Sequence, residues 1–144
     1  MRSVLIATIL LITAFGTQAQ QEAKPVDKSG IASYYHDKFV GRKTATGEVF
    51  SNGHFTAACN TLRLGTYVKV TNLTNGKVVY VRINDRMNAA NTRLIDLARV
   101  AAEQLGFKNR GITNVKVDIV TKEEGKTGIL AQREVPDTAP ANQL

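Results

Sequence analysis

The chain has 144 residues, of which 43% are hydrophobic and 22% charged, a balance that indicates one globular domain and excludes a multidomain enzyme. Its formal net charge of +7 favours anionic partners such as nucleic acid, acidic lipid head groups or cell-wall polymers. The single cysteine, Cys59, excludes an intrachain disulfide, so the core alone must hold the fold together unless the thiol has a role of its own.

Residues 1–19 have the order of a secretory signal peptide. Arg2 precedes an apolar run from Val4 to Ile12, and Thr17 and Ala19 supply the small residues that a signal peptidase requires before its cut. The apolar run is too short to span a bilayer as a helix. We therefore predict export to the periplasm or the cell envelope.

Export narrows the range of partners. Loss of Arg2 with the signal peptide lowers the net charge from +7 to +6, so the exported chain stays basic, yet export argues against nucleic acid. The rest of the sequence has no apolar segment long enough for a membrane span, and Cys59 lies too far from the signal cut to be the lipidated residue of a lipoprotein. We expect a monomer without a transmembrane segment or lipid anchor.

Residues 30–120 carry the features of a folded domain. Residues 20–29 are polar, contain Pro25 and are typical of a flexible lead-in. Residues 121–144 have too little apolar surface to offset the entropy lost on ordering, so we predict a flexible C-terminal tail. The first strand of the domain is predicted at Gly30–Tyr35.

The strongest local signal is a β-hairpin. Tyr67–Asn72 and Val78–Ile83 are rich in β-formers with apolar alternation, and Asn75-Gly76 lies between them. Asn-Gly suits a tight turn because both residues tolerate positive φ.

A second β-rich run, Asn114–Val120, echoes the hairpin. Its Val115-Lys116-Val117 repeats Val68-Lys69-Val70, which is weak evidence for two related halves. Between the hairpin and this last strand, Leu97–Leu105 has apolar residues at helical spacing, with Asp96 able to cap the start and Gly106 suited to the stop.

These elements predict a mainly β domain with about six strands and one short helix. A lone sheet of this size would leave exposed edges, and closing it into a barrel removes them. The most economical fold is therefore a closed β-barrel.

Polar residues gather in residues 41–48, 56–65 and 84–86, where a purely structural loop would not require them. No glycine-rich phosphate loop and no nucleophile elbow is present in the sequence. His36 and His54 do not make a ligand pair, so we expect no metal and no cofactor.

Four residues in or near these stretches have two interpretations each. Asp85 ends a predicted strand, where it is either a turn residue or an acid at the rim of a cleft. Glu48 is either a solvated strand residue or a second acid. Asp96 is most simply a helix cap, with a role in the site as the alternative. Cys59 is by default a small buried hydrophobe, unless its thiol has a role of its own. From the residues alone the chain is a secreted β domain with a candidate carboxylate cleft.

The motifs, taken in order, resemble the rare lipoprotein A (RlpA) family over residues 30–120. They are Gly30–Tyr35, Gly41–Glu48, Thr56–Gly65, Val68–Leu73, Asn75-Gly76, Arg82–Arg86, Arg93–Leu97 and Ala101–Gly106. The resemblance implies a six-stranded double-psi β-barrel made of two interlocked halves. It also implies an envelope protein that acts on peptidoglycan as an endolytic transglycosylase preferring glycan strands without stem peptides, with the cell-division machinery as a candidate partner.

The resemblance places the family's cleft acids on Glu48 and Asp85. The family's third cleft residue is a histidine, and Cys59 occupies its position here. A thiol is a weaker hydrogen-bond donor than an imidazole and a poor substitute for it in this position.

A lytic transglycosylase cuts the β-1,4 bond after N-acetylmuramic acid without water, and the sugar's own 6-hydroxyl closes on C1 to give a 1,6-anhydro end. We expect Asp85 to act first as acid and then as base, with Glu48 raising its pKa or holding substrate and Cys59 lining the floor. Further substrate contacts are expected as stacking by Tyr34 and Tyr35, anion binding by Arg42, Lys43 and Arg86, and contacts from Thr44 and Asp96. The alternative is an expansin-like module that binds cell-wall glycan without cutting it.

Overall fold

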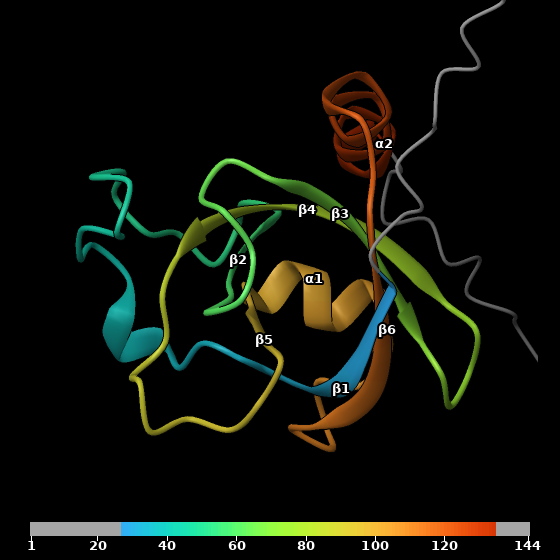
Figure 1. Ribbon diagram of the computed structural model, residues 1–144, viewed down its shortest axis with the longest axis horizontal. Coiled ribbons are helices and arrows are strands. Elements are labelled where there is room, and N and C mark those ends of the chain that lie inside the picture. Colours follow the sequence, from blue (N-terminus) through green and yellow to red (C-terminus); the bar gives the residue numbers. More distant parts are fainter. Residues whose placement is uncertain (1–26, 135–144) are drawn as a thin grey trace, which may run out of the picture.

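The computed structural model describes residues 27–134 and contains six strands that close into a barrel in the order β1–β5–β2–β4–β3–β6 (Figure 1). The strands are β1 Asp27–Tyr34, β2 Thr56–Ala58, β3 Tyr67–Asn72, β4 Val78–Asp85, β5 Ile95–Leu97 and β6 Thr113–Ile119. Two α-helices, α1 Arg99–Gln104 and α2 Lys122–Glu134, and a short 3₁₀ turn, η1 Asp37–Phe39, complete the fold. The predicted closed six-stranded barrel is confirmed, and the predicted signal peptide lies outside the described residues.

The barrel consists of two interleaved halves, β1–β3 and β4–β6. Strand β1 pairs in parallel with β5 as β4 does with β2, and the antiparallel pairs β2·β5 and β3·β6 join equivalent strands. The two Val-Lys-Val repeats lie on the equivalent strands β3 and β6, where Val70 faces Val117. The sequence echo therefore reflects an internal two-fold arrangement of the barrel.

The core fills the barrel interior. Along β3 every second residue is buried, and β4 alternates in the same way up to Ile83. Helix α1 contributes Ala101 and Ala102 to the same apolar cluster, and Leu105, which follows the helix, joins them. Burial of this apolar surface is the main force that stabilises the barrel.

The predicted helix is confirmed, but its cap is different. Asp96 lies within β5, and the helix begins at Arg99. The side chain of Asn52 accepts a hydrogen bond from the Arg99 amide at 2.9 Å, so a residue distant in sequence satisfies this helix end. Gly106, with φ of 75°, ends the helix as predicted.

The predicted hairpin β3·β4 is also confirmed, but the two residues of its Asn-Gly pair differ in backbone conformation. Gly76 has a positive φ of 75°, while Asn75 does not. The amide of Gly76 donates to the carbonyl of Asn72, and the Asn75 side chain reaches the carbonyl of Leu105. Asn75 therefore ties the turn to the end of α1 instead of serving as a left-handed turn residue.

The prediction of a flexible tail from residue 121 is wrong for residues 122–134, which form α2. This helix lies outside the barrel against β3 and β4 (Figure 1). Gly125 and Gly128 face Tyr67 and Tyr80 so closely that a Cβ atom on either glycine would clash with the ring opposite. Helix α2 docks through these glycines and through one apolar side chain, Ile129, which packs against the core cluster, so its sequence has no continuous apolar stripe and resembles a tail.

The lead-in was also predicted too long, because β1 begins at Asp27 and pairs with β6 from its first residue. Within residues 27–134, neither α-helix is long and apolar enough to cross a membrane.

Two long crossover loops position the functional site. Residues 35–55 connect β1 to β2, and residues 86–94 connect β4 to β5. Both loops lie on the left in Figure 1, away from α2. Beneath them a second apolar cluster forms outside the barrel from Tyr35, Phe50, Ala58 and Ala98. The β1–β2 and β4–β5 connections, which are equivalent in the two-fold arrangement, therefore meet at one end of the molecule.

Candidate functional site

A bulge at the end of β4 aims Asp85 toward the crossover loops. Ile83 pairs with Ala57, but Asp85 pairs with Ala58, so Asn84 and Asp85 together oppose one residue of β2. Without this extra residue, alternation would point Asp85 into the barrel with Ile83. The bulge instead turns Asp85 to the outer face, where it contacts Tyr35.

The carboxylate of Asp85 is held by three donors. Its Oδ2 accepts from the Tyr35 hydroxyl at 2.7 Å, and its Oδ1 accepts from the amides of Ala45 at 2.9 Å and Arg86 at 2.8 Å. Burial, followed by the bond to Asp85, raises the pKa of Tyr35, so the phenol remains a donor. Three charge-assisted bonds fix both the position and the orientation of this carboxylate.

A second acid, Asp96, lies in the same row of the sheet. Asp96 pairs with Ser33 on one side and with Ala58 on the other, and Ala58 in turn pairs with Asp85. The Ser33 hydroxyl donates to Asp96 Oδ1 at 3.0 Å. Burial raises the pKa of Asp96 above its ordinary value, and the nearby charge of Asp85 acts in the same direction.

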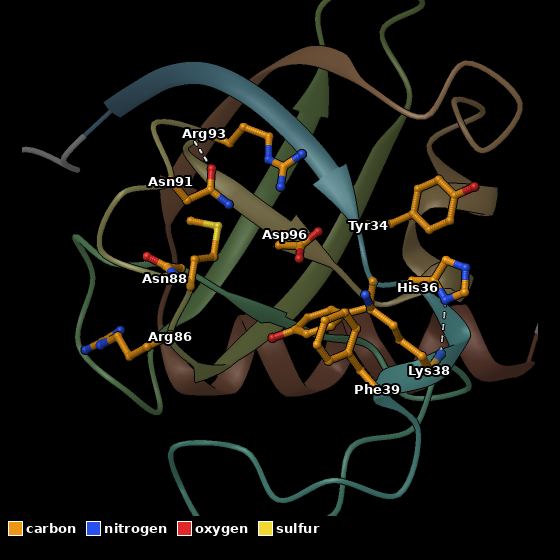
Figure 2. A pocket seen from close by; sticks show the side chains of 11 residues that line it. Tyr34, His36, Lys38, Phe39, Arg86, Asn88, Asn91, Arg93 and Asp96 are labelled. Carbon is orange, nitrogen blue, oxygen red and sulfur yellow. Dashed lines mark hydrogen bonds between the residues drawn. The ribbon is translucent and has the colours of Figure 1, made fainter.

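The two crossover loops and β5 enclose an open cavity of about 490 Å³. Its wall combines aromatic, cationic and amide side chains with one carboxyl group, that of Asp96. Figure 2 shows Asp96 near the middle of these side chains, between Arg93 and Tyr34. The other lining residues are Tyr35, His36, Lys38, Phe39, Arg86, Met87, Asn88 and Asn91. Asp85 lies directly beside the cavity, because its partners Tyr35 and Arg86 both line it.

Glu48 is held in an ion pair. Arg82 donates two hydrogen bonds to its carboxylate, at 2.8 and 2.5 Å, and the Thr46 hydroxyl donates a third at 2.7 Å. The bond from Arg82 is the largest cause that lowers the pKa of Glu48 from 4.5 to about 2. The expected role of Glu48, tuning Asp85 or holding substrate, stays a prediction, and in this structure its carboxylate is directed to Arg82.

Glu48 and Asp85 nevertheless both accept hydrogen bonds from one loop, which carries Ala45 and Thr46. The Ala45 amide donates to Asp85, the Thr46 amide donates to the carbonyl of Asn84 at 3.2 Å, and the Thr46 side chain holds Glu48. The turn that contains Ala45 and Thr46 therefore lies across the end of β4. The structure brings Glu48 and Asp85 to the same end of the barrel.

Cys59 is part of the core. Its side chain is 1% exposed, belongs to the interior apolar cluster and approaches the Thr61 hydroxyl at 3.5 Å. Its backbone is part of the site, because the amide donates to the Asp85 carbonyl and the carbonyl accepts from the Arg86 guanidinium. The thiol is thus a small buried hydrophobic group in the barrel interior, and it does not line the cavity.

The predicted substrate contacts fall into different environments. Tyr34 lines the cavity, and its ring makes an edge-to-face contact with the ring of Phe107. Its hydroxyl donates to the carbonyl of Lys108. Tyr35 is 8% exposed and packed against Phe39 and Phe50, so its ring cannot offer a free face to a sugar. The expected stacking role of Tyr35 is replaced by its bond to Asp85.

Among the remaining predicted contacts, Arg86 and Asp96 line the cavity. Thr44 is buried and bonds to Thr46, so it shapes the loop. Arg42 is exposed and places its guanidinium over the ring of Phe39, at 5.4 Å. Lys43 pairs with Val49 in an isolated bridge. The structure supports cavity positions for two of these five residues.

Sequence reasoning missed much of the cavity wall. Lys38 and Phe39 come from the η1 turn, and Asn88, Asn91 and the Arg93 side chain from the second crossover loop. These segments are irregular, so they have no periodicity that would mark them. A signal was available in the high density of Asn and Arg in residues 84–93.

This arrangement suits proton transfer to and from a bound polar molecule. An open cavity with cationic and amide groups can hold a polar substrate that carries negative charge, and two carboxyl groups lie at its floor and edge. In the described part of the chain, no three His, Cys, Asp or Glu side chains gather as a metal ion would require.

Comparison with known families matches residues 27–117 to the lytic transglycolase family. The endolytic peptidoglycan transglycosylase RlpA of Haemophilus influenzae is 49% identical over 104 residues, which cover 72% of this chain and 36% of that protein. The protein of the same name from Pasteurella multocida is 46% identical over 107 residues, with 74% and 36% covered. The chain thus spans little more than a third of the length of these relatives.

Among solved structures, the Streptomyces papain inhibitor matches with a TM-score of 0.54 and 22% identity, over 66% of this chain and 94% of that one. An expansin from Clavibacter michiganensis matches with a TM-score of 0.51 and 21% identity, over 67% of this chain and 51% of that one. At such identities the likeness concerns the barrel fold alone.

Proposed function

The chain belongs to the RlpA family of lytic transglycolases with a double-psi β-barrel, and on this premise we propose that it acts on peptidoglycan as a lytic transglycosylase. The observation that carries the proposal is the Asp85 carboxylate, fixed by three donors at the edge of a 490 Å³ cavity. Such a group is oriented for proton transfer before substrate arrives.

We propose that the bond cut is the β-1,4 linkage between N-acetylmuramic acid and N-acetylglucosamine, within strands that carry few stem peptides. Asp85 carries a proton in the reaction, and the 6-hydroxyl of the muramic acid closes on C1 to leave a 1,6-anhydro end. The cations Lys38, Arg86 and Arg93 in the cavity wall support an anionic glycan as substrate. The protein would work as an exported monomer, with the division machinery as a candidate partner.

The test is turnover of peptide-free glycan strands, followed by mass spectrometry of the products. We expect 1,6-anhydro ends from wild type and a loss of about 100-fold or more from Asp85→Asn, because an amide can neither give nor take the proton. Glu123→Gln, at an exposed position on α2, is the matched control and should retain full activity. Folded wild type that yields no anhydro ends would contradict the proposal.

Binding without cleavage is the second candidate. Two observations favour it: the Glu48 carboxylate is occupied by Arg82, and a buried thiol stands at Cys59, where the resemblance leads us to expect a histidine. Glycan strands that are retained by the immobilised protein without any new ends would support this candidate over the enzyme.

A further inference from the structure

We propose that Asp96 is a second catalytic carboxyl group, which protonates the leaving sugar oxygen while Asp85 accepts the proton of the attacking hydroxyl. The inference rests on the proposed function and deepens it, because it assigns the two proton transfers of the reaction to two residues.

The strand register places both acids in one row. Asp96 of β5 and Asp85 of β4 each pair with Ala58 of β2, and side chains of paired residues point to the same face of a sheet. The two Cα atoms are therefore two strand spacings apart, roughly 10 Å. Ala58 between them ends at its Cβ atom, and Tyr35, which belongs to the same apolar cluster as Ala58, reaches Asp85 with its hydroxyl.

This separation suits a pair of acids that flank one glycosidic bond. In glycosidases that hydrolyse such bonds, the two carboxyl groups lie about 5–9.5 Å apart. Side chains that extend from backbones roughly 10 Å apart can meet this range. The Asp85 side of the row is fixed by Tyr35, and the Asp96 side by Ser33.

The environments of the two acids differ in the direction that the roles require. Asp96 faces the cavity, is half-buried, and has its pKa raised by burial, which favours the protonated form that a donor needs. Asp85 accepts three hydrogen bonds, which fix the position of its carboxylate beside the cavity. The other titratable groups that line the cavity are Tyr34, Tyr35, His36, Lys38, Arg86 and Arg93.

Glu48 is excluded as the donor by its contacts. Its carboxylate is held by two hydrogen bonds from Arg82, and its pKa is lowered to about 2. A group that stays ionised at any pH where the protein works cannot deliver a proton.

The step balances without water or any co-reactant. The Asp96 proton moves to the glycosidic oxygen as the bond from C1 to that oxygen breaks. The 6-hydroxyl oxygen of the same sugar bonds to C1, and its proton moves to the Asp85 carboxylate. Asp96 is then ionised and Asp85 protonated. Asp85 releases its proton to solvent and Asp96 takes one up, which restores both groups.

The experiment compares two substrates, natural glycan strands and a dinitrophenyl β-glycoside of N-acetylmuramic acid, whose leaving group requires no proton. Asp96→Asn should lose about 100-fold or more on glycan strands but retain most of its activity on the activated glycoside. Asp85→Asn should lose activity on both. Equal turnover of glycan strands by wild type and Asp96→Asn, or an equal loss on both substrates by a folded Asp96→Asn, would overturn the inference.

Ser33→Ala provides a second measurement that keeps the Asp96 carboxyl group in place. The Ser33 hydrogen bond lowers the pKa of Asp96, so its removal should move the alkaline limb of the pH profile on glycan strands to higher pH. An alkaline limb that does not move would count against Asp96 as the donor. If wild type cleaves neither substrate, the proposed function fails, and this inference fails with it.

Discussion

One extra residue in β4 decides the direction of the carboxylate that we place at the centre of the site. Asn84 is buried at the bulge, and Asp85 consequently leaves the alternation that holds Ile83 in the core. Tyr35 then reaches Asp85 across 50 positions of sequence. At the scale of single residues, the site depends on a register irregularity and on one long-range hydrogen bond.

The ion pair of Glu48 and Arg82 predicts how stability depends on pH. A carboxyl group whose pKa is lowered on folding, here from 4.5 to about 2, contributes stability above its ordinary pKa and loses it as the pH falls toward 2. Because the Glu48 side chain is 43% exposed, the pair contributes no more than about 1 kcal/mol.

Glu48→Gln should therefore melt about 4 °C or less below wild type at pH 7. The difference should shrink as the pH is lowered from 4.5 to about 2 in parallel thermal melts of both proteins. Thr127→Ala, exposed on α2 and without a titratable group, serves as control, and its difference from wild type should not change with pH. A difference that stays constant at every pH would argue against the ion pair as its cause.

At the scale of elements, α2 depends on two glycines and one amide. Gln132 exchanges two hydrogen bonds with the backbone of Tyr80, to its amide at 2.5 Å and its carbonyl at 2.9 Å. Strand β4 pairs with β2 only from Arg82 onward. The bonds to Gln132 therefore satisfy backbone groups of β4 that β2 does not reach. Gly125 and Gly128 allow the close approach that these bonds require.

Gly125→Ala should weaken the docking of α2. Alanine normally stabilises a helix by about 1 kcal/mol relative to glycine, but here its methyl group would clash with Tyr67. We expect a lower melting temperature and faster hydrogen exchange of the Tyr80 amide, which loses its partner Gln132. Thr127→Ala, at an exposed position of the same helix, should do neither. Stabilisation by Gly125→Ala would show that α2 is free to shift.

These elements also show what could be predicted from the sequence. The hairpin, the last strand and α1 follow from local alternation and spacing, and all three are confirmed. Helix α2 was missed because small residues dock it, and the Asp96 cap was wrong because the true partner is Asn52, 47 positions away. The candidate acids stood out as polar residues at strand ends, but their partners Tyr35, Arg82 and Ser33 depend on a register that local patterns do not contain.

At the scale of the whole molecule, every strand pairing within residues 27–134 joins one half of the barrel to the other. Strands β1, β2 and β3 pair with β4, β5 and β6 and not among themselves. The internal two-fold arrangement therefore does not create two subdomains, because neither half has a sheet of its own.

Separate peptides of residues 27–74 and 75–134 test this arrangement. Each alone should lack strand structure by circular dichroism, since all of its hydrogen-bonded neighbours are on the other peptide. An equimolar mixture should regain the β signal and a cooperative thermal transition. Cooperative unfolding of either peptide by itself would contradict the interleaved description.

The interleaved pairing has a consequence for folding speed. Asp27 lies opposite Asp118, and Ser33 opposite Asp96, so most of the sheet joins residues far apart along the chain. Such a topology must close large loops before its contacts begin to stabilise it, and proteins of this kind fold in milliseconds to seconds, not microseconds. An emerging chain of this protein can pair β4 with β3 and with β2 once Asp85 has appeared, but β1 finds its first partner only when Leu97 completes β5, and the barrel closes only when β6 arrives last.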